Sequence, residues 1–184
     1  LLTRGRNRGK GYSVREGMLA ARGAFRLFAD ADNSTPIEEV DRLLAKQADT
    51  GAGVVIASRA MRESRLEVRQ PWAREMMGRA FNLVVRLSGL SGFPDTQCGF
   101  KLFTAAAAQD IFPYQTISGW GFDPEVLYIA RSRKLRVVEV PIHWYYMADS
   151  RVNPMRDTIN MLREVFRVRR NGRRGMYKKT GAGD

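Results

Sequence analysis

Short apolar runs of strand length alternate with helical segments along this chain, and this alternation constrains the fold more than any other feature. The strand candidates are the apolar runs at 24–29, 53–57, 99–103 and 137–142. Helices are predicted between and after them, at 13–22, 36–48, 72–87, 105–111, 123–133 and from 155 onward. Strands that alternate with helices predict an α/β fold with a mostly parallel sheet and flanking helices.

The size and composition of the chain suit one domain with a real core. It has 184 residues, of which 44% are hydrophobic. The single cysteine, Cys98, excludes an internal disulfide and a CxxC metal site. The sequence contains no apolar run of roughly 18 residues, the length that spans a bilayer. It begins at Leu1 rather than Met and opens directly on a motif, so we expect further sequence before it.

The charge of the chain indicates an anionic partner. The 31 Lys and Arg residues outnumber 19 Asp and Glu residues, for a net charge of +12. Residues 151–179 hold ten Lys and Arg residues against Asp157 and Glu164, which leaves +8 of the +12 in this stretch. Nucleic acid, anionic lipid and a phosphorylated substrate all remain open on charge alone.

Asp30 and Asp32 form an Asp-Ala-Asp triplet directly after the apolar run 24–29. Ligand sites in open α/β sheets lie beyond the carboxyl ends of strands. Two carboxylates there can hold Mg²⁺ or Mn²⁺ while a diphosphate supplies further oxygens. The same triplet also suits a turn that caps the next helix. Both interpretations stay open on the sequence.

Lys10 and Gly11 lie in a glycine-rich segment, Asn-Arg-Gly-Lys-Gly at 7–11, before the first predicted helix. Glycines with a lysine at a helix N-terminus suit a phosphate group. The segment is not a P-loop, because Gly11 rather than Ser or Thr follows the lysine. A turn that leads into a helix explains it equally well without a ligand.

Arginines crowd the segment after the run 53–57. Guanidinium groups bind phosphate oxygens in bidentate fashion, whereas a solvated loop is the usual explanation of such a cluster. Arg59 directly follows a buried strand, which places it and Arg74 beside the expected site. The outer arginines at 62, 65, 69 and 79 suit a surface.

Two acidic residues are candidates for a catalytic base. Asp95 precedes the strand candidate 99–103, where it could accept the proton of an attacking hydroxyl. A phosphate nucleophile is already ionised near neutral pH, and Asp95 would then serve to position it. Asp123 opens a predicted helix, where the helix dipole favours acids regardless of function.

The last predicted helix carries an apolar stripe, with arginines off that stripe. The stripe consists of Met155, Ile159, Leu162 and Phe166. A basic amphipathic helix suits an anionic membrane surface, or the stripe packs on the domain. A nucleic-acid-binding module is disfavoured, because the basic face is not interleaved with aromatic residues. We expect the tail after Gly172 to be loose.

Seven sequence blocks occur in one order over nearly the whole chain: NRGKG (7–11), DAD (30–32), VVIASR (54–59), DTQCGFKLF (95–103), GWGFDPEVLYIA (119–130), EVPIHW (139–144) and DSRVNP (149–154). Together they resemble the family 2 glycosyltransferases with a GT-A fold, in the group of dolichyl- and polyprenyl-phosphate sugar synthases. The block at 95–103 is most similar to the dolichyl-phosphate β-glucosyltransferases.

This resemblance implies a donor site and a metal. Asp30 and Asp32 would bind Mg²⁺ or Mn²⁺ and the diphosphate of a nucleotide sugar, with Lys10 and Gly11 as further donor contacts.

The resemblance also implies an acceptor site and a base. The acceptor phosphate would be bound by Arg59 and Arg74, with Lys101 and Arg151 as further phosphate contacts. Asp95 would be the base or an orienting carboxylate, and Asp123 is the second candidate for the base.

The implied reaction is inverting transfer of glucose from UDP-glucose to a polyprenyl or dolichyl phosphate, at the cytoplasmic face of a membrane. GDP-mannose as donor and a protein or glycan acceptor remain alternatives, and a nucleotidyltransferase is a further class with a similar metal site. The sequence does not indicate an oligomeric state.

The chain departs from the family pattern at its N-terminus. Family members begin with a strand that ends in Pro-x-Tyr/Phe-Asn-Glu and a second that ends in Asp-Asp-Gly-Ser, and neither motif occurs here. We therefore expect residues 1–154 to form a partial GT-A domain without its first strands, and 155–184 a basic helix and tail. We expect the chain alone to be inactive.

Overall fold

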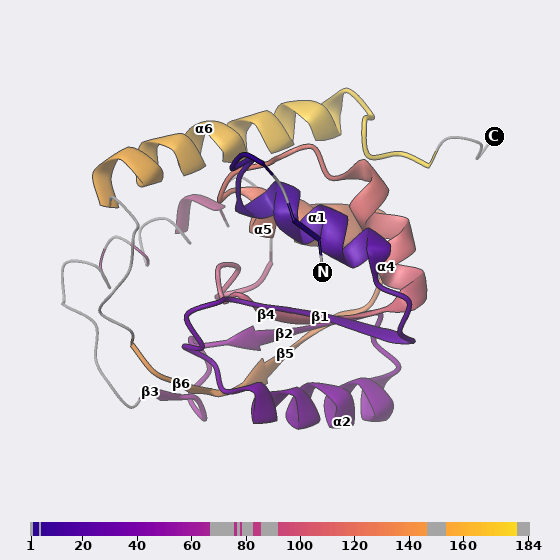
Figure 1. Cartoon of the computed structure of the whole chain (residues 1–184), viewed down its shortest axis with the longest axis vertical. Helices are drawn as coiled ribbons and strands as arrows, with labels where there is room; N and C mark the ends of the chain where they lie inside the picture. Colours follow the sequence, from indigo (N-terminus) through magenta and orange to yellow (C-terminus); the bar gives the residue numbers. More distant parts are fainter. Residues whose placement is uncertain are drawn as a thin grey trace.

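A computed structural model describes residues 2–3, 5–66, 76, 78, 83–85, 92–146 and 154–179. In chain order, its elements are α1 (Lys10–Ala20), β1 (Phe25–Ala29), the 3₁₀ turn η1 (Ile37–Glu39), α2 (Val40–Thr50), β2 (Val54–Ser58), β3 (Arg65–Leu66), β4 (Phe100–Thr104), α4 (Ala105–Ile111), the 3₁₀ turn η2 (Phe112–Tyr114), α5 (Phe122–Ser132), β5 (Val137–Pro141), β6 (His143–Trp144) and α6 (Pro154–Arg173). Figure 1 shows their arrangement.

Within the described residues, the main sheet has four strands in the order β1-β4-β2-β5. β2 pairs with β5 in parallel, whereas β4 is antiparallel to both β1 and β2. Three strands therefore run the same way and β4 runs against them. The α/β class is as predicted, but the sheet is mixed, with one parallel pairing. Alternating strands and helices do not reveal such a reversal, because mixed sheets of this kind are common.

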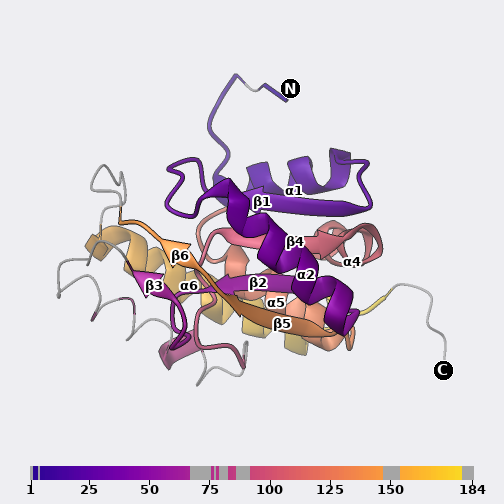
Figure 2. The same ribbon diagram turned by 90° about the horizontal axis from the view of Figure 1, so that it is seen from below.

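Helices cover both faces of the main sheet. α2 packs against one face, and α1, α4 and α5 pack against the other, with α6 outside α5. In the view of Figure 2, α2 lies in front of the main sheet, and α5 and α6 lie behind it. Alternate residues of β2 enter different cores, with Val54 and Ile56 on the α5 side and Val55 and Ala57 on the α2 side. Burial on both faces explains why this strand is continuously apolar.

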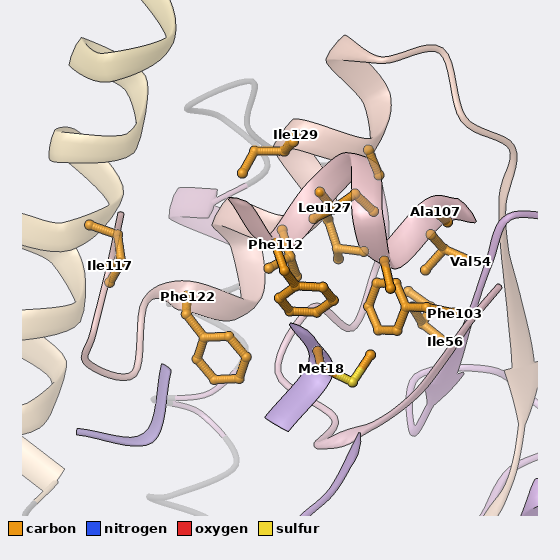
Figure 3. Close-up of a cluster of buried hydrophobic side chains, with 14 of the residues drawn as sticks. Met18, Val54, Ile56, Phe103, Ala107, Phe112, Ile117, Phe122, Leu127 and Ile129 are labelled. Atoms are coloured by element: carbon orange, nitrogen blue, oxygen red, sulfur yellow. The ribbon is translucent and has the colours of Figure 1, made fainter. Parts of the chain in front are cut away.

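The core between the sheet and α5 fixes the start of α5 against β1. Figure 3 shows Phe122, Phe112 and Phe103 in this core. The rings of Phe103 and Phe112 meet edge to face with centroids 5.1 Å apart, and Phe28 of β1 lies 5.6 Å from Phe122. The first turn of α5 is thereby held close to the strand that leads into Asp30.

Local signals explain several element boundaries. The side chain of Thr104 accepts a hydrogen bond from the backbone N–H of Ala107 and caps α4. α2 ends at Thr50, and the residue that caps it, Gly51, has a φ of 64°. The helix expected from Pro36 starts as the turn η1 instead. α1 begins at Lys10 rather than at residue 13, so this lysine lies in the first helical turn.

α6 packs on the core through a face that overlaps the predicted stripe only at Leu162 among the residues whose side chains are described. Val165 and Val168 are buried, whereas Ile159 and Phe166 are 47% and 62% exposed. The inward packing of the stripe is therefore wrong at these two positions, because the valines supply the buried contact. No helix among the described residues is long and apolar enough to cross a bilayer.

The chain remains packed beyond the last turn of α6. Tyr177 is buried, and its hydroxyl donates a hydrogen bond to Oε1 of Glu125 over 2.7 Å. The prediction of a loose tail after Gly172 is therefore wrong as far as Tyr177. The buried partner on α5 could not be recognised from the polar composition of the tail.

Two other predicted segments differ or fall partly outside the described residues. The arginine-rich segment after the run 53–57, which was expected to be a loop or surface, contains the short strand β3, which pairs in parallel with β6. Of the helix predicted at 72–87, positions 76, 78 and 83–85 are helical, and the other positions lie outside the described residues.

Candidate active site

The ends of three strands meet at one edge of the main sheet. β1 ends at Ala29 and β2 at Ser58, and β4 begins at the same edge because it runs against both. The backbone N–H of Asp30 donates to the carbonyl of Gly99 over 2.8 Å, which extends the β1–β4 pairing past the strand. Side chains that follow β1 and β2, or precede β4, are therefore brought to one site.

Asp30 forms an ion pair with Lys10 at this edge, with Nζ 2.6 Å from Oδ1. Burial disfavours the charged form of Lys10, but the carboxylates of Asp123 and Asp30 outweigh it and raise the pKa of the lysine. Gly99 makes room for this pair, since a Cβ there would lie 2.1 Å from the Asp30 carboxylate. The arrangement keeps a cation beside a carboxylate that is still one-third exposed.

Asp32 takes part in the capping turn that the sequence left open. Its Oδ1 accepts a hydrogen bond from the backbone N–H of Ser34 over 3.0 Å, and Asn33 between them has a φ of 54°. The turn uses one carboxylate oxygen of Asp32, so the other oxygen can still bind a metal ion.

The carboxylate oxygens of Asp30 and Asp32 suit a hard divalent cation that a phosphate-containing substrate also helps to coordinate. No group of three or more His, Cys, Asp or Glu side chains in the described part of the chain could hold a metal. Mg²⁺ and Mn²⁺ prefer carboxylate oxygens and commonly complete their shells with water and substrate phosphates. Two carboxylates are enough for that mode of binding, but not for a dedicated protein cage.

The glycine-rich segment 7–11, which leads into the first turn of α1, packs tightly against residues 117–119. A Cβ on Gly11 would lie 2.6 Å from the carbonyl oxygen of Ile117, and one on Gly9 would lie 2.2 Å from that of Ser118. Gly9 also has a φ of 99°, which favours glycine. The glycines are thus explained by packing, and diphosphate binding by Gly11 stays a prediction.

Arg59 and Asp95 form a bidentate ion pair at the end of β2. Nε of Arg59 lies 2.7 Å from Oδ2 and Nη2 lies 2.9 Å from Oδ1, and the backbone N–H of Arg59 also donates to Oδ2. Burial alone would raise the pKa of Asp95, but the guanidinium outweighs it and lowers this pKa to about 2. A carboxylate with so low a pKa is a weak proton acceptor near neutral pH.

Lys101 and Asp123 form a second pair, which is wholly buried. Nζ of Lys101 donates to Oδ1 of Asp123 and, over 2.6 Å, to the carbonyl of Cys98. Burial raises the pKa of Asp123 in spite of the nearby lysines, so Asp123 is the better proton acceptor of the two aspartates. Lys101 is 0% exposed and touches no solvent in this conformation, which makes it a partner of Asp123 rather than a ready phosphate contact.

Sequence reasoning missed the residues that fix the loop before α5. Glu164 of α6 accepts a hydrogen bond from the backbone N–H of Gly121 over 2.7 Å. Glu125 accepts hydrogen bonds from the backbone N–H groups of Thr116 and Ile117. The glycines on both sides of Trp120 were the only signal, because they indicate a close approach that the sequence does not assign to a partner.

Two predicted acceptor residues, Arg74 and Arg151, lie outside the described residues. The site as described therefore joins Lys10, Asp30, Arg59, Asp95 and Asp123, with Asp32 on the adjoining turn.

Comparison with known sequences identifies the family of this chain. The sequence profile of Glycosyl transferase family 2 matches residues 1–112. The chain belongs to this family.

Curated proteins are similar to most of the chain. A dolichyl-phosphate beta-glucosyltransferase of Trichomonas vaginalis is 40% identical over 156 residues, which cover 83% of this chain and 46% of that protein. Proteins of the same name from Saccharomyces cerevisiae and Homo sapiens are 35% and 32% identical, over 94% and 92% of this chain and 55% and 54% of their own lengths. The chain spans about half the length of these relatives.

Solved structures share the fold. Glucosyl-3-phosphoglycerate synthase from Mycobacterium tuberculosis, crystallised with Mn²⁺, UDP-glucose and phosphoglyceric acid, matches with a TM-score of 0.58 and 19% identity, over 96% of this chain and 58% of that one. A second mycobacterial protein has a TM-score of 0.62 and 20% identity, over 89% of this chain and 51% of that one. The predicted GT-A fold of this family 2 chain is thereby confirmed.

Proposed function

We propose that the natural-length protein transfers glucose from UDP-glucose to dolichyl phosphate or another polyprenyl phosphate, with inversion at the anomeric carbon. The names of the relatives support these substrates. The observation that carries the proposal is the meeting of two charged pairs at one sheet edge. The Lys10–Asp30 pair lies where β1 ends, and the Arg59–Asp95 pair joins the end of β2 to the segment before β4. Because β4 pairs with both β1 and β2, a donor site and an acceptor site adjoin.

The donor half of the proposed site consists of Asp30, Asp32 and Lys10. The two aspartates would hold Mg²⁺ or Mn²⁺, which neutralises negative charge on the departing diphosphate. Lys10 would supply a second positive charge to the same diphosphate, from the first turn of α1. Gly11 would contribute only by letting α1 start close to the site.

The acceptor half of the proposed site is built on Arg59. Asp95 engages Nε and Nη2, which fixes the plane of the guanidinium, and the side chain is still 26% exposed. The remaining N–H groups of this fork suit the oxygens of an acceptor phosphate. Arg74 and Arg151 are proposed as further phosphate contacts on the basis of the family resemblance.

The proposed reaction needs no strong base. An oxygen of the lipid phosphate attacks the anomeric carbon of glucose, the bond from that carbon to the diphosphate oxygen breaks, and UDP leaves with the bonding electrons. A phosphate monoester is ionised near neutral pH, so no proton has to be removed from it. We therefore assign Asp95 to positioning, and keep Asp123 as the candidate base for an acceptor that attacks through a hydroxyl.

We further propose that α6 lies on an anionic, cytoplasmic membrane face. Arg163, Arg167 and Arg170 are exposed on this helix, together with Ile159 and Phe166. Basic residues near an anionic surface contribute about 1 kcal/mol each, and exposed apolar side chains can insert into the interface. Such a surface would present the lipid phosphate to the nearby site.

Vesicle binding tests the membrane proposal. We expect the natural-length protein to sediment with vesicles that contain phosphatidylserine, and Phe166→Ser to weaken this binding. Binding should fall as salt is raised, because charges contribute. Equal binding of wild type and Phe166→Ser, without salt dependence, would remove α6 from the proposed contact.

A transfer assay tests the proposed function. The natural-length protein is incubated with labelled UDP-glucose or GDP-mannose, and with dolichyl phosphate or 3-phosphoglycerate as acceptor. We expect glucose on dolichyl phosphate as the main product, with EDTA abolishing it. A product on 3-phosphoglycerate alone would instead favour a non-lipid phosphate acceptor, the class bound by the similar mycobacterial synthase.

A further inference from the structure

We propose that Trp120 is a specificity-determining residue whose indole ring is the platform on which the hexose of the nucleotide sugar stacks, and that Glu164 holds this ring in place. The inference rests on the proposed function and deepens it, because it names the side chain that reads the sugar.

Trp120 lies beside the donor half of the site. Its ring centroid is 5.1 Å from Nζ of Lys10, which in turn lies 2.6 Å from Oδ1 of Asp30. The hexose of a nucleotide sugar is attached directly to the diphosphate, so a diphosphate held at Lys10 and Asp30 brings the hexose next to this ring. Trp120 is 38% exposed, although tryptophan is usually well buried on average.

The backbone on both sides of Trp120 is pinned to α6. The N–H of Gly121 donates to Oε2 of Glu164 over 2.7 Å. A Cβ on Gly119 would lie 2.2 Å from Oε1 of Glu164, and one on Gly121 would lie 2.6 Å from its Cβ. No side chain fits at either glycine without displacing Glu164, so Glu164 packs directly against the backbone on both sides of Trp120.

A pinned loop with an exposed aromatic side chain is suited to binding. An exposed ring that is already held in position loses little conformational entropy when a ligand covers it, which favours affinity. A ring on a mobile loop would lose more. Glu164 is therefore a positioning residue, and it acts on the sugar only through Trp120.

The chemistry of the ring favours glucose over its epimer. An indole presents a flat, electron-rich face, to which the C–H bonds on one face of a pyranose ring are complementary. In UDP-glucose the hydroxyls on C2, C3 and C4 are equatorial and the diphosphate is axial, so the face opposite the diphosphate presents only C–H bonds. The axial 4-hydroxyl of galactose stands on that face. An indole that covers this face therefore favours UDP-glucose over UDP-galactose.

Two simpler roles of Trp120 lead to different outcomes. The ring could serve only as a cation–π partner of Lys10, in which case its loss affects the diphosphate and not the sugar. Alternatively, the indole could contact the lipid acceptor. Neither role predicts a dependence on the stereochemistry of the donor sugar.

Calorimetric titration of the natural-length protein with UDP-glucose, UDP-galactose and UDP, each with Mn²⁺, separates these roles. We expect Trp120→Ala to weaken the binding of UDP-glucose roughly five- to tenfold and the binding of UDP less than about twofold. The preference for UDP-glucose over UDP-galactose should fall accordingly. Trp120→Phe should retain part of the preference. Phe25→Ala, which removes an exposed ring at the opposite end of β1 from Asp30, should leave all three affinities unchanged.

Substitutions at Glu164 test whether its contact with Gly121 positions Trp120. Glu164→Gln retains an acceptor for the Gly121 N–H and should bind UDP-glucose like the wild type. Glu164→Ala should reproduce part of the Trp120→Ala defect for UDP-glucose, without affecting UDP. Melting temperatures of all variants show whether a loss of binding reflects a loss of folding.

Several outcomes would overturn the inference. If Trp120→Ala weakens the binding of UDP and of UDP-glucose equally, the ring acts only through its contact with Lys10. Unchanged UDP-glucose binding with a raised KM for dolichyl phosphate assigns the ring to the acceptor. If the wild type binds every UDP-hexose no more tightly than UDP, the proposed stacking of the hexose on Trp120 is wrong. Binding of GDP-mannose instead of UDP-glucose refutes the proposed donor, and the platform is then judged by comparing GDP-mannose with GDP.

Discussion

The guanidinium of Arg59 engages both carboxylate oxygens of Asp95, with contacts of 2.7 Å and 2.9 Å. The pair lies where β2 ends, and Asp95 is almost entirely buried, with 3% of its side chain exposed. Because the pKa of Asp95 is about 2, the carboxylate remains charged and orients Arg59. This relationship decides how the proposed acceptor site can be tested.

Asp95→Asn separates orientation from base catalysis. The variant loses the charge that holds the fork of Arg59, so we predict a KM for dolichyl phosphate raised about tenfold or more, with a smaller change in kcat. The pH–rate profile near neutrality should keep its shape. A fall in kcat of about a hundredfold or more at unchanged KM would instead identify Asp95 as the base.

Asp95 also predicts how stability depends on pH. Its folded pKa of about 2 lies below the ordinary value of 3.8, so the stabilisation is fully present above the ordinary pKa and is lost as pH falls through 2. The difference corresponds to about 2 kcal/mol. In urea unfolding between about pH 5 and pH 2, the loss of stability should be smaller in Asp95→Asn than in the wild type by about this amount. Identical pH dependence of the two proteins would contradict the pairing in solution.

Gly99→Ala tests whether Asp30 must approach the backbone. The new Cβ would meet the Asp30 carboxylate at 2.1 Å, so we predict that the carboxylate is displaced and that UDP binding with Mn²⁺ weakens about tenfold or more. Gly17→Ala is the matched control, because a Cβ there has no atom within 4 Å and lies inside α1. It should raise stability by about 0.5–1 kcal/mol and leave UDP binding unchanged. Equal UDP affinities in the two variants would count against Asp30 as a donor residue.

Tyr177→Phe tests the docking of the segment after α6. The hydroxyl of Tyr177 donates to buried Glu125, and its removal leaves a carboxylate oxygen with one fewer donor. We predict a loss of about 1–3 kcal/mol in the free energy of unfolding. Tyr145→Phe, at a 37% exposed position, should change it by less than about 0.5 kcal/mol. A melting temperature unchanged in Tyr177→Phe would mean that this segment is not docked in solution.

Much of the fold was predictable from local sequence signals. The four apolar runs correspond to β1, β2, β4 and β5, and α4 lies at the residues expected for it. Signals such as the Thr104 cap and Gly51 act within a few residues, so they are visible in the sequence. The reversed direction of β4 is set by contacts between distant segments, which no local pattern records.

The position of the site could be predicted from the sequence, but the ion pairs within it could not. The strand end located Asp30 and Asp32, whereas the contacts Arg59–Asp95 and Lys101–Asp123 join residues 36 and 22 positions apart. Pairing of β2 with β4 brings Arg59 and Asp95 together, and packing of α5 on the sheet brings Asp123 to Lys101. Neither contact was known from the sequence. For the same reason Lys101 was expected on a phosphate, although it is buried against Asp123.

The role of Asp30 in glucose transfer is tested most directly by the initial rate of transfer of labelled glucose from UDP-glucose to dolichyl phosphate. The rate is measured with Mn²⁺ for the natural-length wild type and its Asp30→Asn variant. We predict labelled lipid with the wild type and a rate at least about a hundredfold lower with the variant, because the metal and the Lys10 contact are both lost. Transfer at equal rates by the two proteins would contradict this role of Asp30.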